Sequence, residues 1–211
     1  MVPPSSGIQN IDVVIHNMTD DPIKWNYLIP LGHQNEWWRY FGEYLWLVNL
    51  VFEKAEQSEV TVISRPVLFL MRHALELGYK GNIVELEKIS GLKSALKFKG
   101  KDSHNLEKLH QGFERHFREI AKRYAIDADV IAQFDRINST LEKLNNVLHR
   151  LDAGSYSFRY PFKPDGTTPS FQKVEKLNIA DVKEMFNAAI TLLKYTTDVV
   201  AEYLPPIDKS L

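Results

Sequence analysis

The sequence contains no cysteine among its 211 residues. Disulfides, thiolate catalysis and zinc sites that need sulfur ligands are therefore excluded. Apolar runs are short, and none reaches the roughly 18 residues that indicate a membrane-spanning helix. The first seven residues also lack the basic and apolar regions of a secretory signal. We expect a cytoplasmic protein with no membrane contact.

Several motifs of familiar enzymes are missing too. The chain has no glycine-rich phosphate loop, no His-Glu-x-x-His, no Gly-x-Ser-x-Gly and no calcium-binding Asp-x-Asp-x-Asp-Gly. Paired helices contribute two Glu-x-x-His motifs to a di-iron bundle, and this chain has a single one, at 107–110. We therefore expect no metal and no cofactor.

Charge is nearly balanced overall, at a formal net charge of −1, but it is unevenly distributed. Residues 64–123 carry 13 basic and seven acidic side chains, whereas residues 1–63 carry three basic and eight acidic ones. A polyanion would therefore bind to the middle third of the chain. The near-neutral total argues against a dedicated nucleic-acid scaffold, which is usually strongly basic.

Residues 64–80 combine a wide apolar face with an unusual set of charges. Their periodicity predicts a helix of about four turns that is buried on most sides and ends near Gly81. Arg72, Glu76 and Lys80 follow each other at intervals of four, so the carboxylate lies between two cations, with His73 beside them. Two interpretations are open: an ion-pair ladder that orients the bundle, or the lining of a ligand pocket.

Four further long helices are predicted, at residues 35–57, 103–124, 127–151 and from Asn178 to just before Pro205. The third has seven apolar residues at alternating spacings of four and three, which favours left-handed bundle packing. We therefore expect an all-α, up-and-down bundle of about five long helices. It would form one domain, residues 35–204, with an irregular N-terminal arm, residues 1–34, packed on it.

Two sequence features outside the helix at 64–80 predict anion binding. His104 is expected in the first turn of a helix that begins at Ser103, and this helix follows a lysine-rich connector. A long aromatic and proline-rich loop precedes the last helix. Alternation of Phe158, Tyr160 and Phe162 there permits a short strand, with Arg159 on its other face as an anchor for Glu76 or for a ligand phosphate.

The order of three motifs resembles that of HEPN-like proteins, a bacterial helical superfamily that includes toxin ribonucleases and abortive-infection proteins. The motifs are Arg-His-Ala-Leu-Glu-Leu-Gly-Tyr-Lys at 72–80, Asp-Ser-His-Asn-Leu-Glu-Lys-Leu at 102–109 and Ser-Phe-Arg-Tyr-Pro at 157–161. The resemblance implies an all-α bundle that is frequently dimeric, with RNA cleavage across the dimer groove in active members. The ribonuclease signature of that superfamily, an Arg followed after four to six residues by His, is absent here.

Three hypotheses of function follow. The first is a HEPN-like protein of a bacterial stress or phage-defence system, which binds a nucleotide or RNA through a defined set of side chains: Arg72, His73, Glu76, Lys80, His104, Arg159 and Tyr160. The second is a metal-independent ribonuclease that uses Arg72 with His73, or Arg159 with Tyr160. The third is a non-enzymatic interaction module that forms a homodimer or docks a regulatory protein partner.

Overall fold

The structure is a computed structural model that describes residues 36–93 and 98–205. By its internal contacts the chain divides into a unit of residues 1–35 and a unit of residues 36–211. The predicted arm, residues 1–34, and its expected packing lie outside the described residues. The predicted bundle domain, residues 35–204, corresponds to the second unit, which is described below.

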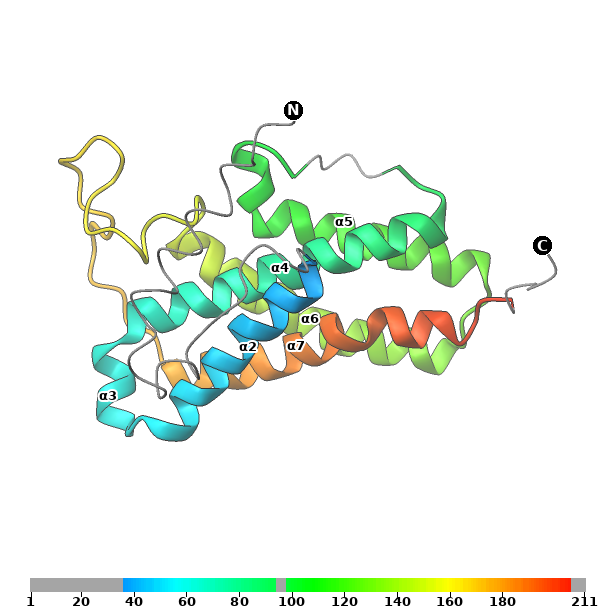
Figure 1. Cartoon of the computed structure of the whole chain (residues 1–211), viewed down its shortest axis with the longest axis horizontal. Coiled ribbons are helices and arrows are strands. Elements are labelled where there is room, and N and C mark those ends of the chain that lie inside the picture. The colour runs from blue at the N-terminus through cyan, green and yellow to red at the C-terminus, as the bar shows by residue number, and fades with distance from the viewer. Residues whose placement is uncertain (1–35, 94–97, 206–211) are drawn as a thin grey trace, which may run out of the picture. The chain divides into compact units, whose positions relative to one another are not determined.

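The described part of the chain is all-α, which confirms the predicted fold class (Figure 1). It has five long helices, one short helix and one 3₁₀ turn: α2 (Trp37–Lys54), α3 (Gln57–Val62), α4 (Ser64–Ser90), η2 (Lys101–His104), α5 (Leu106–Arg123), α6 (Ala128–Leu151) and α7 (Ile179–Ala201). None of these helices is both long and apolar enough to cross a membrane.

Helix α4 lies at the centre of the bundle, against α2, α5 and α7. It is longer than predicted, because it continues through Gly81 and ends at Gly91, whose φ of 69° is left-handed. Gly81 instead gives room to α2: a Cβ at this position would lie 3.2 Å from the Trp38 ring. The glycine expected to stop the helix is therefore a packing residue.

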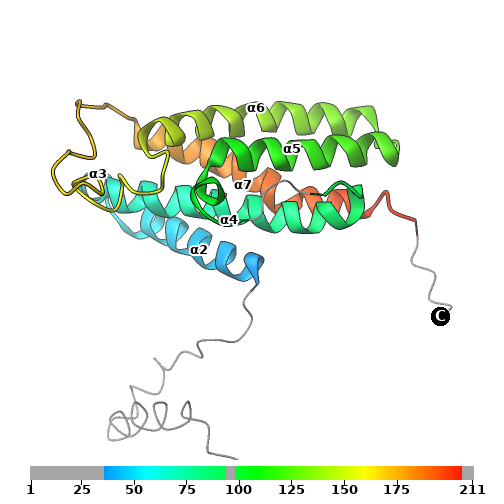
Figure 2. The same ribbon diagram turned by 90° about the horizontal axis from the view of Figure 1, so that it is seen from above.

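Helices α4 and α5 run in the same direction, which departs from a strict up-and-down order (Figure 2). Arg72, near the start of α4, contacts His104 just before α5, whereas Ser90 at the end of α4 lies 2.8 Å from the imidazole Nδ1 of His116 in α5. The other long helices alternate in direction.

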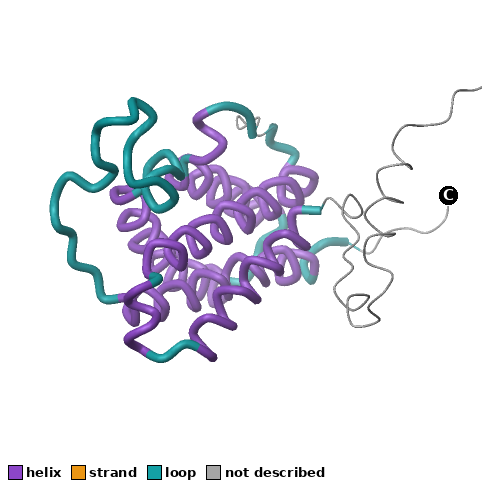
Figure 3. The backbone as a smooth tube through the Cα atoms, turned by 60° about the vertical axis from the view of Figure 1, so that its left-hand side comes forward, coloured by secondary structure: helices purple, strands orange, loops and turns teal. Residues whose placement is uncertain are grey.

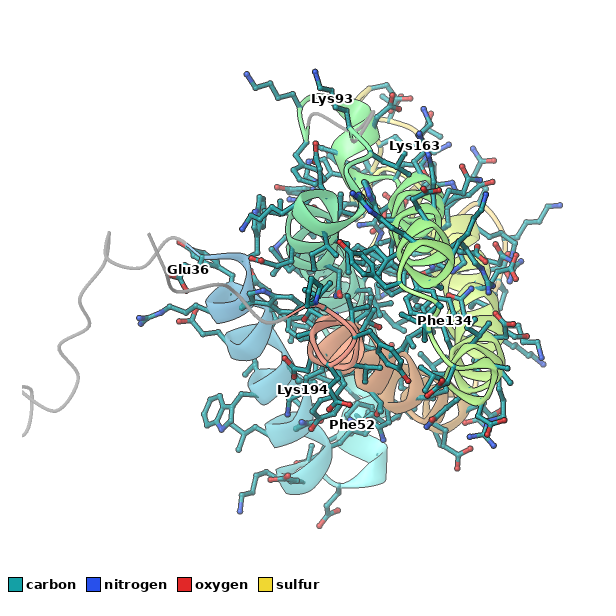
Figure 4. The ribbon with its side chains drawn as sticks, turned by 90° about the vertical axis from the view of Figure 1, so that its right-hand side faces the viewer. Glu36, Phe52, Lys93, Phe134, Lys163 and Lys194 are labelled. Atoms are coloured by element: carbon teal, nitrogen blue, oxygen red, sulfur yellow. The ribbon has the colours of Figure 1, made fainter. Side chains whose placement is uncertain are left out.

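The periodic face of α6 packs as predicted. Phe134, Leu141, Leu144 and Leu148 are buried, and the Phe134 ring stacks on Phe117 of α5 with centroids 3.6 Å apart. Figure 4 looks down the bundle and shows Phe134 among the helices, with Lys93 at the outer edge. Burial of this face holds α5 and α6 together.

Two local predictions are wrong. Asn105, not Ser103, caps α5, because its side chain accepts the Lys108 amide while the Ser103 hydroxyl donates to the Gly100 carbonyl. The loop before α7 forms no strand: turns replace it, and an isolated bridge joins Phe162 to Pro169.

The predicted cap of α7 is confirmed, since the Asn178 side chain accepts the amides of Ala180 and Asp181. The connection from α6 to this cap lies at one end of the bundle, next to α3 (Figures 1 and 3). It brings the predicted loop residues close to the start of α4.

Candidate functional site

Arg72 is the most deeply buried of the predicted site residues. Its side chain has no exposed surface, and its guanidinium donates three hydrogen bonds. Nε donates to the Asp152 carbonyl at 2.9 Å, one terminal nitrogen to the His104 carbonyl at 2.5 Å, and the other to the Glu76 carboxylate at 3.3 Å. Arg72 therefore ties α4 to the segment before α5 and to the end of α6, and has no surface for a ligand.

Glu76 is the anionic centre of this arrangement. One carboxylate oxygen accepts from the Lys80 ammonium at 2.7 Å and lies 2.9 Å from the His104 Nδ1, while the other accepts from Arg72. The predicted ladder of Arg72, Glu76 and Lys80 is thus present, with His104 as a fourth member. We call these four residues and Asp152 the buried charge cluster.

The cluster shifts the proton affinity of its members. Burial by itself raises the pKa of Glu76, but the hydrogen bond and charge of Lys80, together with His104, outweigh it, so this pKa lies below its ordinary value. Burial also lowers the pKa of Arg72, against the attraction of Asp152 and Glu76. Glu76 is therefore held as a carboxylate, which suits an ion-pair partner better than a general base.

Two members of the cluster lie at its edge. The Lys80 ammonium lies over the rings of Trp37 and Phe98, 5.4 and 5.9 Å from their centroids. The His104 side chain is 47% exposed, so its ring is held from inside by Glu76 and open to solvent outside. Among these side chains, His104 is the one that a ligand could reach directly.

Asp152 is a buried residue that the sequence did not single out. It caps the turn that follows α6, because one carboxylate oxygen accepts the amides of Tyr156 and Ser157 at 2.5 and 2.7 Å. The other oxygen lies 3.8 Å from Arg72 Nε and accepts no hydrogen bond from the residues that the structure describes. An aspartate at a helix C-terminus interacts unfavourably with the helix dipole. This unfavourable position is the sequence signal that could have indicated a compensating cation beside Asp152.

Arg159 and Tyr160 follow directly from this capped turn and are both exposed. The Arg159 guanidinium donates twice to the Ser155 carbonyl and lies over the Phe69 and Tyr160 rings, at 5.4 and 5.3 Å. The alternative in which Arg159 pairs with Glu76 is wrong, because Glu76 is enclosed by its three other partners.

His73 occupies a separate, half-buried position on α4. Its ring packs edge-on against Tyr44, at 4.5 Å between centroids, and stacks on Phe69 at 5.7 Å. Burial is the main reason that the His73 pKa lies below its ordinary value. Phe69 is therefore in contact with both His73 and Arg159, and links these two predicted residues.

A pocket of about 450 Å³ adjoins Arg159 and Tyr160. Its lining also includes Arg65, Ser157 and aromatic rings, and it contains no carboxylate. Arg65 lies over the Phe171 ring at 5.9 Å and forms no ion pair with any described residue. We call this cavity the Arg65–Arg159 pocket. Two guanidinium groups beside aromatic rings, without an acidic partner, can hold a phosphate group.

Six of the seven predicted residues thus fall into two groups. Arg72, Glu76, Lys80 and His104 meet in the buried charge cluster, whereas Arg159 and Tyr160 line the pocket, and His73 lies between them beside Phe69. The two groups are joined through Asp152, whose carbonyl accepts from Arg72 and whose carboxylate accepts an amide of the turn before Arg159. Within the described ranges, no three metal-ligating side chains gather at one point.

Comparison with family models, curated proteins and solved structures finds no match to this chain.

Proposed function

We propose that this chain is a HEPN-like, nucleotide- or RNA-associated protein of a bacterial stress or phage-defence system, and that it binds its ligand at the Arg65–Arg159 pocket. The observation that carries the proposal is the pair of arginines, which share one pocket with no carboxylate in its lining. A guanidinium presents donors in a fork that matches phosphate oxygens. Phosphate is the group that nucleotides and RNA have in common.

The surroundings of the pocket favour a nucleotide over a bare anion. Tyr160 is 46% exposed at the rim, next to Arg159, and its ring offers a base a stacking surface. The volume of about 450 Å³ falls in the usual range for small-molecule sites. A base stacked on the exposed part of Tyr160 would lie beside the pocket that both arginines line.

The buried charge cluster has a supporting role in this proposal. Arg72 donates to the Asp152 carbonyl, and the Asp152 side chain fixes the turn whose Ser155 carbonyl holds Arg159. This chain of contacts keeps the Arg159 guanidinium oriented before a ligand arrives, which lowers the entropy cost of binding. Arg72 is therefore a positioning residue in the proposed site.

Binding of a short fluorescein-labelled single-stranded RNA, with AMP as competitor, tests the proposal by fluorescence anisotropy. We expect Arg65→Ala and Arg159→Ala each to weaken binding by about tenfold, the equivalent of one charge-assisted contact. Thermal stability should stay unchanged, because neither side chain is buried. Arg136→Ala, an exposed arginine on α6, is the matched control. Equal affinity of the wild type and the Arg65→Ala/Arg159→Ala variant would reject the pocket.

One ribonuclease hypothesis has support from a specific contact. Arg72 cannot touch a substrate, but Arg159 and Tyr160 lie side by side in the pocket, as a phosphate-binding group and an acid or base would. Incubation of the purified chain with total RNA in EDTA tests this activity. If the RNA stays intact at a large excess of protein, the ribonuclease hypothesis is rejected and RNA binding is the activity that remains.

The cellular setting, the homodimer and the regulatory partner stay predictions that come from the motif resemblance. Plaque counts on bacteria that express the wild type or Arg159→Ala would test the defence role. A tenfold or larger protection that disappears in the variant is the expected result. Light scattering of the purified chain measures its self-association.

A further inference from the structure

A second cavity with an excess of positive charge lies next to the Arg65–Arg159 pocket. Its volume is about 210 Å³, and its lining comes from the end of α6 and from the loop that leads to α7. The charged residues in this lining are one carboxylate, Glu175, and three cations: Arg150, Lys163 and Lys173. We call it the Lys163–Lys173 cavity. Because the cations outnumber the carboxylate, the cavity favours an anionic ligand.

The carboxylates near this cavity are engaged by other groups. Glu175 pairs with Arg150 at 3.2 Å. Asp165 attracts Lys163 from the tip of the same loop, but its carboxylate accepts two main-chain amides. Lys163 and Lys173 are both exposed, and neither forms an ion pair or a side-chain hydrogen bond with the described part of the chain. These two ammonium groups are therefore open to a ligand.

Hydrogen bonds fix the loop that carries Lys163 close to Tyr160. The Lys163 amide donates to the Thr168 carbonyl at 2.7 Å, and the Ser170 hydroxyl donates to the Tyr160 carbonyl at 2.7 Å. The main chain is thus closed into a turn between these residues. A cation on a fixed main chain loses less entropy when it contacts a ligand.

Phe171 lies where the two cavities meet, because it lines both of them. It is half-buried, and Arg65 lies over its ring, 5.9 Å from the centroid. A further depression, of about 610 Å³, also includes Phe171, and its charged residues are Arg65, Lys173 and Glu175. It therefore connects the two cavities. A ring at the junction of two cationic cavities suits a single nucleic-acid strand, because bases stack on rings while cations follow the phosphates.

We propose that the ligand is a single-stranded oligonucleotide, which places one phosphate at the Arg65–Arg159 pocket and a second phosphate at the Lys163–Lys173 cavity. This inference rests on the proposed nucleotide binding and narrows its ligand class. A mononucleotide has one phosphate and would occupy one cavity. A nucleoside diphosphate has two phosphates but no base between them to stack on Phe171, whereas an oligonucleotide has both.

Competition against the fluorescein-labelled RNA compares ligands that have one and two phosphates. We expect the 5′-phosphorylated diadenylate pApA to compete at least about tenfold better than AMP, as expected for one further charge-assisted contact. In Lys163→Ala/Lys173→Ala this advantage should disappear, while AMP should bind as it does to the wild type. Arg65→Ala/Arg159→Ala should weaken both ligands. Lys122→Ala/Lys143→Ala, which replaces exposed lysines on α5 and α6, is the matched control and should change neither.

Salt dependence supplies a second readout. Each phosphate contact with a single strand contributes about 0.7 to the slope of log affinity against log salt concentration. The slope for pApA should therefore be smaller by about 0.7 or more in the double-lysine variant, whereas the slope for AMP should stay the same. The deoxy form of pApA carries the same phosphates, and its competition relative to pApA shows which sugar the site prefers.

Failure of this inference can be told apart from failure of the proposed function. Equal competition by AMP and pApA, or an advantage of pApA that survives in the double-lysine variant, would overturn the inference and leave nucleotide binding intact. Competition by ADP as strong as that by pApA would overturn it too, because the lysines would then bind a pyrophosphate. Weaker AMP binding in the double-lysine variant would contradict a separate second phosphate site. Absence of binding by the labelled RNA and by every competitor would reject the proposed function itself.

Discussion

Replacement of Arg72 by methionine should destabilise the bundle strongly. The substitution keeps most of the side-chain volume but removes the donors from the Glu76 carboxylate and from the carbonyls of His104 and Asp152. A buried acceptor left without a donor costs about 1–3 kcal/mol. Breaking a buried ion pair from one side costs about 3–5 kcal/mol. These costs overlap, so we expect a loss of about 3–5 kcal/mol in the free energy of unfolding.

Urea unfolding followed by circular dichroism measures this loss. The m-value should stay the same, since the area exposed on unfolding barely changes. Arg136→Met is the matched control: this arginine is exposed on α6, and its replacement should change the free energy of unfolding by no more than about 0.5 kcal/mol. A loss below about 1 kcal/mol for Arg72→Met would refute the structural role of the cluster, because no buried acceptor would then have lost its donor.

A double-mutant cycle measures how much of the stabilisation comes from the contact between Arg72 and Glu76. Glu76→Gln removes the anion while keeping its shape, and Arg72→Met/Glu76→Gln removes both charges. Because the two side chains are in contact, we expect a coupling energy of about 0.5–3 kcal/mol. A coupling energy of zero would mean that Arg72 stabilises the fold through the two carbonyls alone.

Three further predictions concern acid sensitivity, the turn after α6 and helix packing. In the folded chain the pKa values of His73 and Glu76 lie below their ordinary values of 6.5 and 4.5. The contribution of each group to stability is therefore complete at a pH above its ordinary pKa, and it is lost as the pH falls through the lowered pKa of the folded chain. Urea unfolding should therefore show falling stability as the pH drops below about 6.5, with a smaller drop in His73→Phe. Asp152→Ala should speed hydrogen exchange at amides 156 and 157, whereas Asp152→Asn, which keeps the acceptor oxygen, should change it little. Gly78→Leu should destabilise the bundle by about 1–3 kcal/mol, because a Cβ at this position would already lie 3.0 Å from a neighbouring ring. Gly42→Leu is the control and should not destabilise the bundle, because the space around its Cβ is open. Thermal unfolding compares the two variants.

Periodicity was sufficient to predict the helices and part of the cluster. The repeat in α6 and the wide apolar face of α4 follow directly from local spacing, and so does the carboxylate of Glu76 between Arg72 and Lys80. Residues four apart on a helix are neighbours whatever the tertiary structure does. Contacts of this kind can therefore be read from the sequence.

The separation of the predicted residues into a buried cluster and a pocket could not be predicted from local spacing. Arg72 meets the Asp152 carbonyl across 80 positions of sequence, and no local pattern specifies such a contact. The parallel course of α4 and α5 brings His104 back to the first half of α4, whereas a strict up-and-down order would have placed it at the other end. Arg65 is not among the predicted site residues, because its relevance comes from the pocket that it shares with Arg159.

Location of a bound phosphate analogue tests the central claim most directly. In crystals of the full chain soaked with tungstate, we expect the anomalous signal of tungsten between the Arg65 and Arg159 side chains, and no such signal in Arg159→Ala. Tungstate beside His104 with an empty pocket, or no ordered tungstate in the wild-type chain, would contradict the account.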